Sequence, residues 1–309
     1  MILNPKVIYK TMNIKNIIRN QSVRHFLLKL FVWLPDRIML PFQYWLILRR
    51  KLDMKNPKRF TEKIQCYKAF YRNKEMLRCV DKFLVRDYVI EKLGTDKYLN
   101  RLYQVCDKAE DIDWESLPDK FVIKTTDGGN GDNVFICRNK SIIDKQSIVK
   151  KINSWKGKKL YSISREWAYI GAKESRIIVE EYLSEPNEED LKDYKFLCFN
   201  GKFKYLELHT SRFNGHKRGY WNENLEYLNG YSCTYPPLEE EFNLPHNIQQ
   251  MIRVAETLSR DFPFARIDLY NINGRIVFGE ITFYPSSGYM QYSPDEFDIY
   301  LGKEFNINF

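Results

Sequence analysis

The sequence lacks the cysteine and histidine patterns that are typical of metal sites. Its six cysteines include no CxxC pair, and its four histidines are scattered along the chain. Structural zinc sites need closely spaced ligands of these types, so no zinc finger is predicted. The nucleotide-binding patterns GxxxxGK[ST] and GxGxxG are also missing, as is the GxSxG pattern of serine hydrolases. These absences exclude a Walker-type nucleotide site and a catalytic serine triad.

Long hydrophobic runs are missing as well. In the basic N-terminal part, the longest stretch without a charged residue is 38–48, and Pro41 interrupts it. A transmembrane helix needs about 20 apolar residues, so none is predicted. A signal peptide is not expected, because charges recur and no small-residue cleavage site follows. Because the cysteines lie in apolar runs without pairing patterns, we expect reduced thiols and a cytoplasmic protein.

The net charge of +9 is unevenly distributed. Residues 1–51 carry ten Lys and Arg residues and one acidic residue, Asp36, whereas the other residues carry 39 basic and 39 acidic side chains. A neutral body argues against a basic groove, so we expect no nucleic-acid partner. Large apolar residues such as Trp33 and Trp45 are interspersed with the basic ones. This segment is expected to contact the inner surface of an anionic membrane or to pack as helices on the body, and these alternatives are compatible.

Helical and extended patterns mix along the chain and predict an α+β fold. Helices are expected at residues 60–70, 81–93, 147–155 and 244–262, and strands at 99–106, 121–124, 133–138 and 176–183. A strong turn signal, Asn200-Gly201, joins two further strands at 194–200 and 202–209. Because many strand pairs would be antiparallel, a parallel doubly wound sheet is not expected.

The most informative segment is a second predicted hairpin, FPFARIDLYNINGRIVFGEITF. Its NING turn would return the chain so that Asp268 and Glu280 lie near each other, and alternation puts Glu280 and Thr282 on one face. Two carboxylates and a short oxygen ligand suit Mg²⁺, which leaves its other positions to phosphates and water. Arg266 would direct a permanent positive charge to the same place. The alternative is an ordinary hairpin with an exposed polar face.

A glycine-rich loop follows another predicted strand. Lys124 ends that strand. Two threonines follow it, and the sequence DGGNGD comes next. Backbone N–H groups of such a loop can surround phosphates while the lysine neutralises their charge. The alternative is an ordinary hairpin turn.

The order of these features resembles the ATP-grasp ligases. Asp81-Lys82, Lys124 before its loop, Glu180-Glu181, an Asp-x-Lys strand, and the Arg-x-Asp and Glu-x-Thr strands follow one another in that order. From about residue 56 to the C-terminus, the phrases NPKRFTEKIQ, DKFLVRDYVIEKLG, FVIKTTDGG, DYKFLCFNGK and GEITFYPSSG are similar to the teichuronopeptide-type (TupA-like) branch. That branch occurs in bacterial surface-polysaccharide biosynthesis.

The resemblance implies an ATP-grasp fold, in which ATP is held between two α+β subdomains. The expected parts are a basic helical N-terminal segment (1–55), an N-terminal subdomain (56–118), a small lid subdomain (119–185) and a catalytic core subdomain (186–309).

The resemblance also implies a role for each site residue. The residues expected to bind ATP are Lys82, Lys124, Gly128, Gly129, Glu180, Glu181, Tyr182, Leu183, Asp193 and Lys195. Of these, Glu180 and residues 181–183 would form the hinge that binds the adenine base. The Mg²⁺ ligands would be Asp268, Glu280 and Thr282, and the catalytic residues Arg266 and Lys195. Many ATP-grasp enzymes have Asn at the position of Thr282. The TupA-like branch commonly has His at the position of Asp127. Arg86 would assist the phosphates or pair with a neighbouring acid.

The segment HTSRFNGHKR is a candidate substrate-binding loop. Its basic and titratable side chains, with Arg212 and His216 preferred, would suit an anionic substrate such as a uronic acid. The alternative is a solvated basic loop.

We therefore expect an ATP- and Mg²⁺-dependent carboxylate–amine ligase that works through an acyl phosphate. Its partners would be an anionic saccharide or polysaccharide precursor and an amine such as an amino acid. Two alternatives are an ATP-grasp kinase that phosphorylates a sugar hydroxyl and a glycosyltransferase of a polysaccharide cluster. The DxD letters of Asp111-Ile112-Asp113 lie in a predicted polar loop and do not favour the glycosyltransferase.

Overall fold

The computed structural model describes residues 31–128, 133–155, 161–171, 175–185, 191–210 and 216–307. Its helices are α3 (Asp36–Leu48), α4 (Phe60–Phe70), α5 (Glu75–Cys79), α6 (Leu84–Leu93), α7 (Lys145–Asn153), α8 (Tyr161–Ser164), α9 (Trp167–Ile170), α10 (Ile248–Ser259) and α11 (Glu296–Glu304). Its longer strands are β1 (Leu102–Cys106), β2 (Phe121–Thr125), β3 (Val134–Cys137), β4 (Ile177–Glu181), β5 (Asp193–Phe199), β6 (Lys202–Thr210), β7 (Lys217–Asn222), β9 (Phe264–Ile272) and β10 (Arg275–Thr282). The short strands β8 (Ser232–Cys233) and β11 (Tyr292–Ser293) pair with each other.

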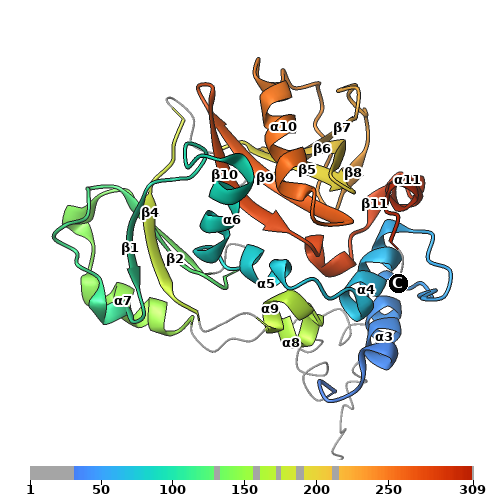
Figure 1. Ribbon diagram of the computed structural model, residues 1–309, viewed down its shortest axis with the longest axis horizontal. Helices are drawn as coiled ribbons and strands as arrows, with labels where there is room; N and C mark the ends of the chain where they lie inside the picture. The colour runs from blue at the N-terminus through green and yellow to red at the C-terminus, as the bar shows by residue number, and fades with distance from the viewer. Residues whose placement is uncertain are drawn as a thin grey trace, which may run out of the picture.

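The smaller sheet lies at one end of the molecule, with strand order β1-β4-β2-β3 and antiparallel pairing (Figure 1). The β-branched side chains Ile177 and Val179 favour the extended backbone of β4. They share a hydrophobic cluster with Ile148 of α7 and with Trp155. Strand β1 precedes residue 119 and pairs with β4, so it contributes to this sheet.

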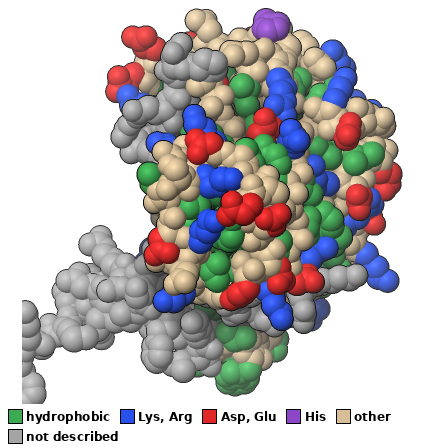
Figure 2. Space-filling model, turned by 90° about the vertical axis from the view of Figure 1, so that its left-hand side faces the viewer, with side chains coloured by type: hydrophobic (Ala, Val, Ile, Leu, Met, Phe, Trp, Pro, Cys, Tyr) green, Lys and Arg blue, Asp and Glu red, His purple; other side chains and the backbone are tan. Residues whose placement is uncertain are grey.

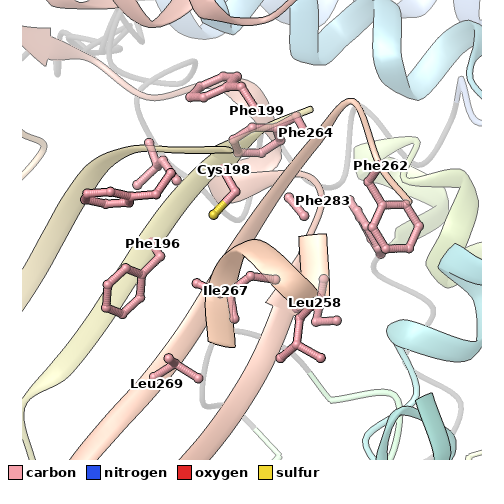
Figure 3. Packing of buried hydrophobic residues seen from close by; sticks show 14 of the residues in the cluster. Phe196, Cys198, Phe199, Leu258, Phe262, Phe264, Ile267, Leu269 and Phe283 are labelled. Carbon is pink, nitrogen blue, oxygen red and sulfur yellow. The ribbon is translucent and has the colours of Figure 1, made fainter. Parts of the chain in front are cut away.

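The larger sheet has the strand order β10-β9-β5-β6-β7. Hydrophobic and polar residues alternate along its strands, so one face of the sheet is hydrophobic and the other is polar. Phe196 of β5 and Ile267 and Leu269 of β9 are buried in the same cluster as Leu258 of α10 (Figure 3). Successive strand residues point to opposite faces, so Lys195 and Asp268 lie on the face away from α10. The apolar residues therefore fix the sheet against its helix, and the charged residues are held on the opposite side.

Two helices begin later than the sequence pattern predicts. The carboxylate of Asp81 accepts a hydrogen bond of 2.8 Å from the N–H of Leu84, where α6 begins. Lys82 therefore lies in the turn before the helix, and the expectation of a helical lysine is wrong. The turn at Pro245 precedes α10, whose first residue is Ile248.

All six cysteines are buried and none forms a disulfide, as expected. Burial raises the pKa of the Cys66 thiol to about 12, so this group stays protonated and acts as a small apolar side chain. In the part of the chain that the structure describes, no helix has the length and apolar character needed to cross a bilayer.

Candidate active site

The hairpin of β9 and β10 places two carboxylates opposite each other. Its register pairs Asp268 with Glu280 and Arg266 with Thr282, which confirms the predicted proximity of the two acids. A β-bulge interrupts the register between Phe278 and Glu280. Gly279 lies in the bulge, where a Cβ atom would be 3.0 Å from the carbonyl oxygen of Asp268. The close approach of the two backbones therefore requires glycine or a local shift.

Arg266 connects the polar side chains of this hairpin. Its guanidinium binds Asp268 through two hydrogen bonds, Nε to Oδ1 and Nη2 to Oδ2, both 2.7 Å long. The same Nη2 lies 3.4 Å from Glu280 Oε1 and 3.1 Å from Thr282 Oγ1. Thr282 in turn donates to Glu280 over 3.1 Å. The four predicted residues thus form one hydrogen-bonded group on the polar face.

Lys195 extends this group onto β5. Its ammonium pairs with Asp268 and, over 2.6 Å, with Asp193. The β5–β9 register places Lys195 directly opposite Asp268, so neighbouring strands fix this contact. The Asp193 and Lys195 side chains are only 3% and 4% exposed. Such buried charges are tolerated because each has an oppositely charged partner.

The two carboxylates differ in environment. Burial raises the pKa of Asp268 to about 6, against the opposing effect of Arg266 and Lys195. For Glu280, partial burial also favours the protonated form, but Lys82, Lys195 and Arg266 together lower its pKa. The Glu280 side chain is 45% exposed, whereas that of Asp268 is 3% exposed. Glu280 is therefore the more exposed member of the pair, and its carboxyl has the lower pKa.

A second charged group lies on the smaller sheet. Lys124 Nζ binds Glu180 Oε2 over 3.0 Å, and Arg86 Nη1 lies 3.5 Å from Glu180 Oε1. Arg86 therefore pairs with an acid, one of its two predicted roles. The Glu180 side chain holds these two cations in place. The carbonyl of Glu181 accepts a hydrogen bond from Asn100 Nδ2 at 2.9 Å, which fixes the end of β4.

The two charged groups approach each other around Lys82. Its backbone N–H donates to Thr126 O over 2.9 Å, and its side chain donates to the carbonyl of Gly128. Burial lowers the pKa of Lys82, while the charge of Glu280 on the larger sheet raises it. An ion pair of 3.2 Å between Arg275 of β10 and Glu181 of β4 also joins the sheets. Lys82 thus interacts electrostatically with charged residues of both sheets.

Some predicted residues lie elsewhere or outside the described residues. Gly129 and Arg212 lie outside them, so their placement is not described. Tyr182 and Leu183 directly follow β4, at the end of the smaller sheet. The His216 ring lies 4.9 Å from the ring of His209.

The sequence patterns did not identify a buried cluster of Glu207, His209 and Arg218. Glu207 Oε1 accepts from His209 Nε2 at 2.7 Å and from Arg218 Nη1 at 2.9 Å. Burial lowers the pKa of His209 to about 4, although Glu207 opposes this shift. The imidazole is therefore neutral at pH 7 and donates through Nε2. His209 Nδ1 and Arg218 Nε have no hydrogen-bond partner among the described residues.

This cluster adjoins the first group through the sheet. Glu207 is the cross-strand partner of Lys195, and His209 is that of Asp193. The Asn200-Gly201 turn pairs β5 with β6, but a β-bulge between Leu197 and Cys198 shifts the register by one residue, so the turn alone would set Lys195 opposite Leu206. The cluster therefore places a neutral histidine and an ion-paired arginine next to the strand that carries Asp193 and Lys195.

A match over most of the chain identifies its family. A family model of TupA-like ATP-grasp proteins matches residues 62–306. The chain belongs to the TupA-like ATP-grasp family. No curated protein matches it significantly.

Solved structures of ATP-grasp ligases resemble this family member in fold. The D-alanine–D-alanine ligase from Bacillus anthracis is 17% identical, with a TM-score of 0.40 over 67% of this chain and 57% of the ligase. Its complex with ATP matches at 14% identity and a TM-score of 0.38, covering 67% of this chain and 54% of the ligase. An N5-carboxyaminoimidazole ribonucleotide synthetase with ADP is 16% identical, with a TM-score of 0.41 over 66% of this chain and 45% of the synthetase. The matches thus span less than two thirds of each enzyme.

The residues present in this ATP-grasp chain fit a magnesium nucleotide. Asp193, Asp268 and Glu280 supply carboxylate oxygens beside the cations Lys195 and Arg266, and Glu280 is the most exposed of the three acids. Within the described ranges, no group of three or more His, Cys, Asp or Glu side chains could hold a metal. Two carboxylates and a hydroxyl nevertheless match Mg²⁺, which takes few protein oxygens when phosphates complete its shell.

Proposed function

We propose that the chain is an ATP- and Mg²⁺-dependent ligase that joins a carboxylate to an amine. The observation that supports this most is the position of Lys82, whose charge interacts both with Glu280 of the Arg266–Asp268–Glu280 group and with the Lys124–Glu180 pair. Cations from one sheet would hold the phosphates, while carboxylates from the other would hold the metal. When bound, Mg²⁺ supplies charge neutralisation during phosphoryl transfer.

The proposed reaction has two steps. A carboxylate oxygen of the substrate attacks the γ-phosphorus, the bond to ADP breaks, and an acyl phosphate forms. The amine then attacks the acyl carbon, phosphate leaves with the bonding electrons, and the nitrogen loses a proton to give the amide. Arg266 would stabilise the oxyanion formed by amine addition, and Lys195 the transferred phosphoryl group. No side-chain nucleophile is required.

The carboxylate substrate is proposed to be an anionic saccharide or polysaccharide precursor, and the amine an amino acid. This part of the proposal rests on the resemblance to the teichuronopeptide-type branch and on the basic segment HTSRFNGHKR.

Product analysis tests the proposal. The purified protein is incubated with ATP, Mg²⁺, uronic acid-containing saccharides and amino acids, and the products are identified by mass spectrometry. We expect ADP, phosphate and an amide. A phosphorylated sugar without an amide would instead establish the kinase, and formation of AMP would rule out the acyl-phosphate route.

Lys124→Ala is expected to weaken ATP binding by about tenfold to a hundredfold. The reason is the loss of a charge-assisted hydrogen bond, which contributes about 1.5–3 kcal/mol. Isothermal titration calorimetry with Mg·ATP measures the affinity. Lys120→Ala removes an exposed lysine just before the same strand and should bind like the wild type. Equal affinity of Lys124→Ala and Lys120→Ala would remove Lys124 from the phosphate site.

A further inference from the structure

Helix α3 has two different apolar faces. One face, including Leu40 and Tyr44, is buried against the body. On the opposite side, Ile38, Phe42 and Trp45 are 56%, 44% and 50% exposed. Their spacing of four and three residues places them on one stripe of the helix.

The residues before α3 enlarge this surface. Phe31, Val32 and Trp33 are 41%, 37% and 76% exposed. In the described part of the chain, six of the fourteen exposed large hydrophobic side chains therefore lie within residues 31–45. Single exposed apolar residues are ordinary, but such a concentration marks an interaction site. We call these six residues the α3 surface.

Exposed basic residues flank the α3 surface in the sequence. Arg37, Arg49 and Lys51 are adjacent in sequence, and residues 1–30 add six Lys and Arg residues and no acidic residue. The single acid of this region, Asp36, is bound to Arg165 at 2.9 Å. By contrast, the face at the smaller sheet mixes basic and acidic side chains (Figure 2).

We infer that the α3 surface binds an anionic lipid membrane, with α3 lying in the plane of the interface. Tryptophan and phenylalanine would enter the headgroup region, while the arginines and lysines would meet the lipid phosphates. Each basic residue near such a surface contributes about 1 kcal/mol before salt screening. A second copy of the chain fits less well, because it would bring a second basic rim against the first. This inference is independent of the proposed ligase reaction.

Vesicle co-sedimentation of the full chain tests the inference. Wild-type protein should bind vesicles of phosphatidylcholine with phosphatidylserine, bind pure phosphatidylcholine weakly, and dissociate at high salt. Phe42→Ser/Trp45→Ser should lower the apparent affinity at least about tenfold, since two buried aromatic contacts are lost. Ile136→Ser/Ile142→Ser is the matched control, because Ile136 and Ile142 are exposed on the smaller subdomain.

Two results would overturn the inference. If Phe42→Ser/Trp45→Ser binds anionic vesicles as well as the wild type, the basic N-terminal residues act alone and the α3 surface does not bind lipid. If instead the wild type forms a dimer that this variant loses, and no vesicle binding occurs, the occupant is a second copy. ATP turnover in solution should be equal in both variants and the wild type, which separates this test from that of the ligase reaction.

Discussion

Glu280→Gln is expected to lower turnover to below about 1% of the wild-type rate while the protein stays folded, as is usual when a key electrostatic group is lost. The substitution keeps the size and hydrogen-bonding capacity of the side chain but removes the charge of the more exposed carboxylate. The fold should tolerate it, since the side chain is 45% exposed and held by Arg266 and Thr282 rather than by the core. Release of ADP at saturating ATP and Mg²⁺ measures the effect.

A second site variant and a control variant test the same assignment. Asp268→Asn should cause a similar loss, and because Asp268 is buried between Lys195 and Arg266, it should also lower thermal stability. Glu240→Gln, an exposed acid outside the site, should be unchanged in both respects. An ordinary hairpin predicts near-neutral effects for all three, so undiminished ADP release by Glu280→Gln would refute the metal assignment and the ligase proposal with it.

Arg266→Ala is expected to reduce the rate by roughly two to three powers of ten, as the loss of one oxyanion-stabilising group commonly does. ATP binding should be retained, because the proposed role arises only after phosphoryl transfer. Arg266→Lys should recover little activity, since an ammonium cannot reproduce the two parallel bonds to Asp268. Rate measurements and calorimetry on the same preparations separate binding from catalysis.

The contacts of Arg266 with Asp268 make the ATP affinity of the Arg266→Ala variant a test of its role. The guanidinium is the bidentate partner of Asp268, so its removal also changes the charge balance around the carboxylates. If ATP affinity falls in step with the rate, Arg266 acts by holding Asp268, and its role on the oxyanion is wrong. Arg253→Ala, an exposed arginine on α10, controls for the loss of one positive charge.

Sequence patterns predicted the local parts of the site well. Alternating residues and a turn at Asn273-Gly274, both with positive φ, define the β9–β10 hairpin without reference to distant residues. The same reasoning found the β5–β6 hairpin through Asn200-Gly201. Local signals sufficed because each of these contacts is made within a single short connection.

Long-range neighbours could not be predicted in this way. Alternation shows which residues share a face but not which strands lie side by side, so the β5–β9 pair that joins Lys195 to Asp268 was found only in the structure. Glu207 and Arg218 were missed for the same reason: their significance depends on lying beside that pair. Lys82 was placed on a helix because its residue pattern continues that of α6, but Asp81 accepts a hydrogen bond from the N–H of Leu84 and the helix begins there, two residues after Lys82.

The bulge at Gly279 determines which face of the hairpin carries Glu280. Between the turn and Phe278, the register pairs Leu269 with Phe278, and continuing it would set Asp268 opposite Gly279 and turn Glu280 toward the hydrophobic side. The extra residue rotates the rest of β10 by one position and returns Glu280 to Asp268. A hairpin that paired Gly279 regularly, without the bulge, could keep its turn and its sheet order, yet Glu280 would lie opposite Ile267 on the hydrophobic side. The strand order of this hairpin therefore does not depend on the bulge, whereas the position of Glu280 does. Alignments of related chains are best compared first at this position.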